Sequence, residues 1–200
     1  MNRSGPQRFI PIILIIIVVV VAIAALISLG RSIFGGSGEE KVPDVNVGQQ
    51  SLLNTAIDRS VRLTVRGPIV ANEDFHSYTI TASPTARNMT IYNGYLDEQV
   101  ESKDLPNNTR AYEQFVFALD RANMMKGSVP TGETNDRRGL CATGRVYEYE
   151  VLQASNSIKK LWTTTCSGSK GSLDASNQQL LRLFQVQIPE FSTLARKVKL

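Results

Sequence analysis

The chain has few of the residues that build metal sites and nucleophilic sites. Its 200 residues include one histidine and two cysteines. These three side chains cannot complete a tetrahedral zinc site without carboxylates, and their spacing matches no zinc motif. The carboxylates are scattered, and none forms a marked acid–base pair. We therefore expect no metal, no cofactor and no catalytic residue, although an enzyme with a site that the sequence does not reveal stays open as a hypothesis.

A strong excess of one charge is also lacking. The chain has 22 Lys+Arg and 18 Asp+Glu, a formal net charge of +4, and the two signs are interspersed. A nucleic-acid interface needs a basic face together with stacking aromatic side chains. We therefore expect no nucleic-acid partner.

Residues 9–29 carry no charge at all. They read FIPIILIIIVVVVAIAALISL. At 1.5 Å per residue, a helix over this run spans about 31 Å, which matches the hydrocarbon core of a bilayer. Within lipid the backbone must pair inside the segment, so β-branched residues also become helical. The run predicts one transmembrane helix.

The charges that flank this run predict its orientation. Arg3 and Arg8 precede it, whereas Arg31 is followed by Glu39 and Glu40. The positive-inside rule then places residues 1–8 in the cytoplasm and the rest of the chain outside. The expected location is the plasma membrane, crossed once.

Two alternatives to a membrane anchor are less favoured. Residues 22–24 (Ala-Ile-Ala) have the small side chains of a signal-peptide cleavage site, but the apolar run continues beyond them. A buried core helix would need a polar face, and this run has none.

The rest of the chain divides into a linker and one domain. Residues 30–48 contain Gly35, Gly36, Gly38 and Pro43, so we expect a flexible linker that does not continue the helix. Residues 49–200 are long enough for one domain with its own core.

Periodicity predicts an α+β fold for this domain. Residues 61–66 alternate apolar and polar side chains, as a half-buried strand does. The sequence predicts two hairpins and several helices with one apolar stripe each. The hairpins are expected over residues 77–93 and 145–166, and the helices over residues 49–58, 107–125, 174–188 and 191–200. The side chains of residues 107–109 (Asn-Asn-Thr) offer caps for the second of these helices, and Asp174 offers a cap for the third. In sum, we expect an antiparallel sheet with two packed helices.

The order strand–strand–helix occurs twice in this pattern, first after residue 77 and again after residue 145. It suggests a duplicated ββα unit with a pseudo-twofold sheet. The alternative is chance, since many α+β domains give the same order.

The two cysteines flank the second hairpin. The midpoint between Cys141 and Cys166 falls beside the predicted turn at residues 154–157. Opposed residues of antiparallel strands lie within the Cα separation that a disulfide tolerates. We therefore expect a Cys141–Cys166 disulfide, with odd positions of the first strand facing even positions of the second. A bulge at Gly144 would absorb a register shift of about two residues.

A free cysteine acting with His76 as nucleophile and base is the reactive alternative. His76 lies beside Glu73 and Asp74 near a strand start, and nothing in the sequence orients it. A histidine that faces solvent is the simpler interpretation.

Four segments resemble a family. They are residues 66–73 (RGPIVANE), 76–80 (HSYTI), 141–144 (CATG) and 161–166 (LWTTTC). Together they resemble small membrane-anchored envelope proteins of the Saccharibacteria, bacteria with reduced genomes that live on host bacteria. The resemblance covers most of the chain. It implies a surface setting and contact with a host, and it transfers no catalytic residue.

These observations favour a non-enzymatic envelope protein whose outer domain binds a protein or another envelope component. A pilin-like subunit, with an apolar N-terminal helix and a disulfide-closed head, is the second hypothesis. Against it, Arg8 rather than glycine precedes Phe9, and the glycine-rich linker interrupts the helix.

Overall fold

The structure, a computed structural model, describes residues 18–24, 46–129, 139–168 and 171–198. The chain divides into two units, residues 1–45 and 46–200. In the first unit the described residues 18–24 are helical. Among the described residues, no helix has both the length and the apolar character needed to cross a membrane. Residues 1–8, most of the predicted span 9–29 and most of the predicted linker 30–48 lie outside the described ranges.

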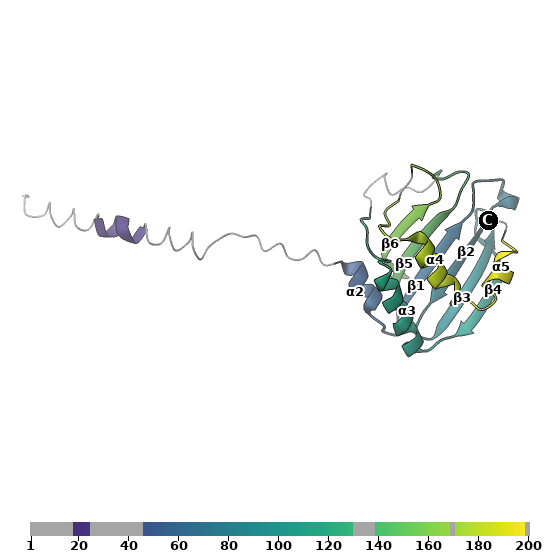
Figure 1. The fold of residues 1–200 in the computed structure, drawn as a ribbon, viewed down its shortest axis with the longest axis horizontal. Helices are drawn as coiled ribbons and strands as arrows, with labels where there is room; N and C mark the ends of the chain where they lie inside the picture. The colour runs from purple at the N-terminus through teal and green to yellow at the C-terminus, as the bar shows by residue number, and fades with distance from the viewer. Residues whose placement is uncertain (1–17, 25–45, 130–138, 169–170, 199–200) are drawn as a thin grey trace, which may run out of the picture. The chain divides into compact units, whose positions relative to one another are not determined.

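The second unit is an α+β domain with a six-stranded antiparallel sheet (Figure 1). The strands follow the spatial order β4-β3-β2-β1-β5-β6. Their bounds are β1 Arg59–Arg66, β2 His76–Ala82, β3 Ala86–Asn93, β4 Glu98–Pro106, β5 Val146–Gln153 and β6 Asn156–Thr164. The helices are α2 Val47–Leu53, α3 Thr109–Arg121, α4 Asn177–Gln185 and α5 Phe191–Ala195, and η2 Asn72–Asp74 is a 3-10 turn. The predicted α+β class is confirmed.

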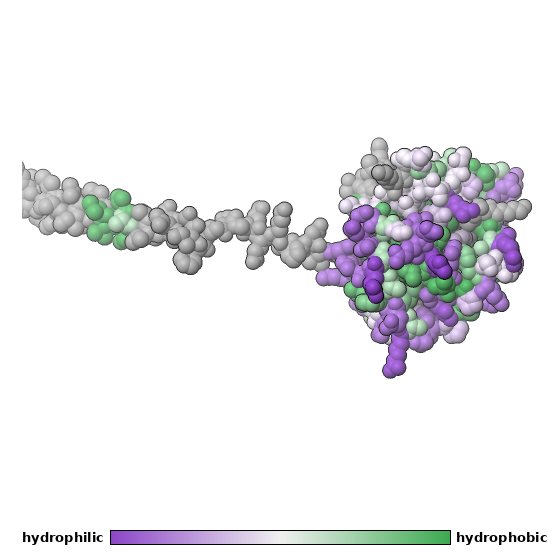
Figure 2. All heavy atoms as spheres, viewed as in Figure 1, coloured by the Kyte–Doolittle hydropathy of each residue, from purple (hydrophilic) through white to green (hydrophobic). Residues whose placement is uncertain are grey.

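The alternation in β1 decides which face of the sheet carries the core. Val61, Leu63 and Val65 are buried and pack with the apolar stripes of α3 and α4 in one cluster. The helices lie across this face of the sheet (Figure 1). Over the same side of the domain, hydrophilic and hydrophobic side chains are interspersed at the surface (Figure 2). The opposite face of the sheet carries the polar residues of β1.

The helices differ from the prediction at their ends. Asn46 caps α2 by accepting from the Gln49 amide, so the first turn of α2 lies within the predicted linker. Asn108 caps α3 as expected, but α3 ends at Arg121 because Asn123 adopts a left-handed φ of 60°. The cap of α4 is Ser176 and not Asp174; Asp174 instead pairs with Lys126 at 3.1 Å.

The strand β4 was not predicted from the sequence. Its residues EQVESKDLP are largely charged or exposed, and they show no apolar alternation of the kind that marks β1. It is an edge strand that pairs only with β3. Charged side chains protect such edges from pairing with other chains, so the sequence of an edge strand resembles that of a loop.

The β5–β6 hairpin confirms the predicted disulfide and corrects the predicted register. Cys141 and Cys166 are joined, with Cα atoms 5.3 Å apart. They lie just outside the two strands. Odd positions face odd positions, so Tyr149 opposes Leu161, and Trp162 opposes Glu148 on the other face. The register shift occurs at Val151/Leu152 rather than at Gly144.

The predicted duplication is not matched by a symmetric sheet. The hairpins β2–β3 and β5–β6 lie on either side of β1, and both β2 and β5 run antiparallel to β1. They therefore run in the same direction, while α3 and α4 join one core on one face. A twofold axis normal to the sheet would make the two hairpins run in opposite directions, but they run in the same direction. A twofold axis along β1 would place α3 and α4 on opposite faces of the sheet, but both pack on one face. The pseudo-twofold sheet is wrong, and a common origin of the two halves stays a hypothesis.

Candidate functional site

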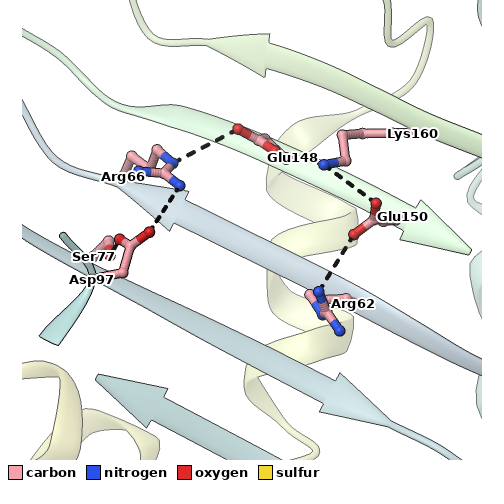
Figure 3. Close-up of polar contacts among 7 residues, drawn as sticks. All are labelled: Arg62, Arg66, Ser77, Asp97, Glu148, Glu150 and Lys160. Carbon is pink, nitrogen blue, oxygen red and sulfur yellow. Dashed lines mark hydrogen bonds and ion pairs between the residues drawn. The ribbon is translucent and has the colours of Figure 1, made fainter. Parts of the chain in front are cut away.

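The polar face of the sheet holds a cluster of ion pairs (Figure 3). Strand register places its members together: Arg62 opposes Glu150, and Glu150 opposes Lys160. Arg62 lies 3.8 Å from Glu150, and Lys160 lies 3.2 Å from Glu150 and 3.5 Å from Glu148. The two glutamates are almost fully buried, so their charges need these cationic partners.

The cluster continues to the turn between β3 and β4. Arg66 bridges Glu148 at 3.9 Å and Asp97 at 3.5 Å, and the Ser77 hydroxyl donates to Asp97 at 3.5 Å. Asp97 adopts a left-handed φ of 53° in this turn. Three cations and three carboxylates thus pair with one another (Figure 3). Their arrangement holds the β3–β4 turn against the ends of β1 and β2.

The same turn is tied to the loop between β1 and β2. The Tyr95 hydroxyl donates to the Val70 carbonyl at 2.6 Å and accepts from the Val70 amide at 3.2 Å. The Asn72 side chain accepts from the Tyr95 amide at 2.9 Å. The ring of Tyr95 stacks on buried Phe75 with centroids 4.3 Å apart. These contacts hold the two loops, which are far apart in sequence, in one fixed arrangement.

These ordered loops expose apolar side chains. Leu96 is 95% exposed at the turn, and Ile69, Val70 and Tyr95 are between 39% and 47% exposed. We call these four residues the tip patch. Single exposed apolar residues are ordinary on protein surfaces, but a contiguous group is typical of interaction sites. The tip patch is the candidate functional site.

The disulfide supports the tip patch from a third loop. The Ile69 amide donates to the Ala142 carbonyl at 2.8 Å, and Ala142 directly follows Cys141 in the chain. Gly144 lies so close to the disulfide that a Cβ atom there would clash with the Cys141 sulfur and the Thr165 hydroxyl. The bond therefore fixes the loop that holds Ile69.

The residues that the sequence singled out fall in different places. Cys141 and Cys166 come together as a disulfide pair, so the structure has no free thiol that could act with His76. His76 Nδ1 lies 2.8 Å from the Asp74 carbonyl oxygen. Across the part of the chain that the structure describes, no group of histidine, cysteine and carboxylate residues could hold a metal ion.

Sequence reasoning missed the tip patch. A signal was present, because Tyr95 and Leu96 are apolar residues in a turn directly after Asn93 and Gly94. Turns usually carry polar residues, so an apolar pair there indicates either burial or contact with a partner. Only the structure shows that Leu96 is exposed.

A cavity of about 190 Å³ lies between α4, α5 and the sheet. Its walls include Val65, Tyr78, Leu181 and Phe191. Pockets for small-molecule ligands usually measure about 300–1,000 Å³, so this cavity is a weaker candidate than the tip patch.

Comparisons with known proteins do not assign the chain to a family: no protein-family model matches it, and no curated protein is significantly similar to it in sequence.

Proposed function

We propose that this protein is a non-catalytic binding protein of the cell envelope and that its tip patch contacts a protein partner. The observation that carries the proposal is Leu96, an apolar side chain that is 95% exposed in an ordered turn. Burial of a leucine in a partner contributes about 1.5–3 kcal/mol. Because the two loops are already ordered by Tyr95 and Asn72, little of that gain is lost to ordering on binding.

The proposed setting is a domain outside the cytoplasm, anchored by a single membrane helix over residues 9–29. The apolar run and its flanking charges support this location. The Cys141–Cys166 disulfide supports it independently, since disulfides persist in oxidising compartments. The resemblance to envelope proteins of the Saccharibacteria points to the same bacterial surface.

Site-specific photocrosslinking in living cells tests this function. A benzophenone amino acid is placed at position 96 of the full-length chain and irradiated in intact cells. We expect a crosslinked protein adduct, because the tip patch would be covered by its partner. The matched control is position 57, where Ile57 is 72% exposed but precedes β1 at the other end of that strand.

The result is read by comparing the adducts at position 96 with those at position 57. An adduct at position 96 that is missing at position 57 supports the proposal. Equal adducts at both positions indicate random collision, and no adduct at position 96 removes the tip patch as a binding site.

A further inference from the structure

The segments that carry the tip patch have a charge opposite to that of the rest of the chain. These segments are residues 67–75, the loop between β1 and β2, and residues 94–98, the β3–β4 turn with the first residue of β4. They contain Glu73, Asp74, Asp97 and Glu98 and no lysine or arginine. The two segments carry a charge of −4. Since the whole chain has a net charge of +4, all other residues together carry +8. All four acidic residues are exposed. The apolar side chains of the tip patch therefore share their two segments with four exposed acidic residues, which we call the acidic rim.

Few positive charges offset this rim. Arg66, which is 39% exposed, pairs with Asp97 and Glu148. The imidazole of His76 faces the Asp74 carbonyl. Arg145, near the disulfide loop, is exposed and adds one further cation. Glu73, Asp74 and Glu98 make no ion pair with other described residues. Their charge is thus directed at solvent or at a partner.

From this arrangement we infer that the partner surface is an apolar groove of a protein, rimmed by lysine or arginine side chains. The inference rests on the proposed function and specifies the chemistry of the partner. Complementary charge around an apolar centre accelerates association and excludes partners of the wrong sign. A bilayer surface that contains anionic lipids would repel this rim, so the acidic residues argue against insertion of Leu96 into such a surface.

The test combines the crosslinker at position 96 with changes of charge. In full-length protein we replace the rim by Glu73→Lys with Asp74→Lys, and in a second variant by Glu98→Lys. Glu113→Lys is the matched control, because Glu113 is exposed on α3 away from the tip. We expect the adduct yield to fall about tenfold in the rim variants, as for a loss of electrostatic steering, and to stay unchanged in the control.

The partner and its crosslinked peptide are then identified by mass spectrometry. A single protein whose crosslinked peptide lies in an apolar groove flanked by lysine or arginine supports the inference. An adduct with lipid, an adduct with a second copy of this chain, or a groove without basic residues overturns it. So does an adduct whose yield does not respond to the rim variants, and in that case the proposed function still stands. Loss of all adducts at position 96 in the wild-type background overturns both.

Thermal melting of each variant provides the control for folding. Because Glu73, Asp74 and Glu98 are exposed, we expect melting temperatures within a few degrees of the parent protein. If the double variant melts early, the Glu98→Lys variant alone decides the result.

Discussion

At the scale of single residues, Tyr95 connects the two loops of the tip patch. Its hydroxyl makes two hydrogen bonds to Val70, and its ring stacks on Phe75. No local rule places a tyrosine opposite a valine 25 positions away. The contact exists because β2 and β3 form a hairpin that brings the end of β3 beside the start of β2.

We predict that Tyr95→Phe lowers the free energy of unfolding by about 1 kcal/mol, because the hydrogen bonds are lost while the stacking is kept. Amide hydrogen exchange at Val70 should become faster, and adduct formation from position 96 should weaken. Urea unfolding and exchange measured by NMR check the first two effects. Tyr92→Phe, on β3 just before the turn, is the matched control. Unchanged exchange at Val70 in Tyr95→Phe would show that the hydroxyl does not order the loop.

At the scale of elements, the disulfide and the hydrogen bonds between loops hold the loops of the sheet in position. The Cys141–Cys166 bond closes a loop over the β5–β6 hairpin, with a sequence separation of 25. The chain-entropy account of disulfides assigns a bond across a loop of this length about 3 kcal/mol. The same bond positions Ala142, the partner of Ile69.

We therefore predict that Cys141→Ala with Cys166→Ala lowers the free energy of unfolding by about 3 kcal/mol. Because the Ile69 loop also loses its support, adducts from position 96 should decrease more than the loss of folded protein explains. Urea denaturation and crosslinking under native conditions measure the two effects. Wild-type protein treated with reductant should reproduce both, and a reduced protein with unchanged stability would contradict the role of the bond.

Three features of the sheet also show which structural elements a sequence pattern can predict. Residues 61–66 alternate because one face of β1 is buried and the other is not, so that strand was predictable. Strand β4 alternates little, because it lies at the edge and buries little on either face. The register of β5 with β6 depends on a bulge at Val151/Leu152, which the symmetry of the two cysteines could not reveal.

At the scale of the whole molecule, three buried tyrosines make the free energy of unfolding depend on pH in the alkaline range. Burial raises the pKa of Tyr78, Tyr112 and Tyr149 well above the ordinary value near 10. Above pH 10 the unfolded chain releases these protons and the folded chain retains them. Unfolding is then favoured, so stability is present below pH 10 and falls as the pH rises.

We predict that the free energy of unfolding decreases above pH 10 by up to about 4 kcal/mol per pH unit, the limit for three tyrosines. Urea midpoints measured from pH 8 to 11 check this. Tyr149→Phe, which also removes the hydrogen bond to Asn177, should reduce the slope by about a third. Midpoints that stay constant above pH 10 would refute the linkage.

The proposed location makes a separate prediction for the whole molecule. A membrane-impermeant thiol reagent on intact cells should add no label before reduction and two labels after reduction, as read from the mass of the intact protein. This result requires a domain outside the cytoplasm and an oxidised Cys141–Cys166 pair. Labelling only after lysis would reverse the topology, and labelling without reduction would show free thiols.

Local patterns in the sequence were enough to predict the α+β class, β1, the helix capped by Asn108 and the pairing of the two cysteines. Each of these depends on local periodicity, on a cap or on the presence of only two cysteines. Three features became visible only in the folded domain: β4 forms one edge of the sheet, Leu161 and not Trp162 faces the core beside Tyr149, and the tip patch is exposed. The physical reason is that exposure and strand register depend on contacts between residues distant in the chain, and side-chain periodicity within one segment does not contain that information.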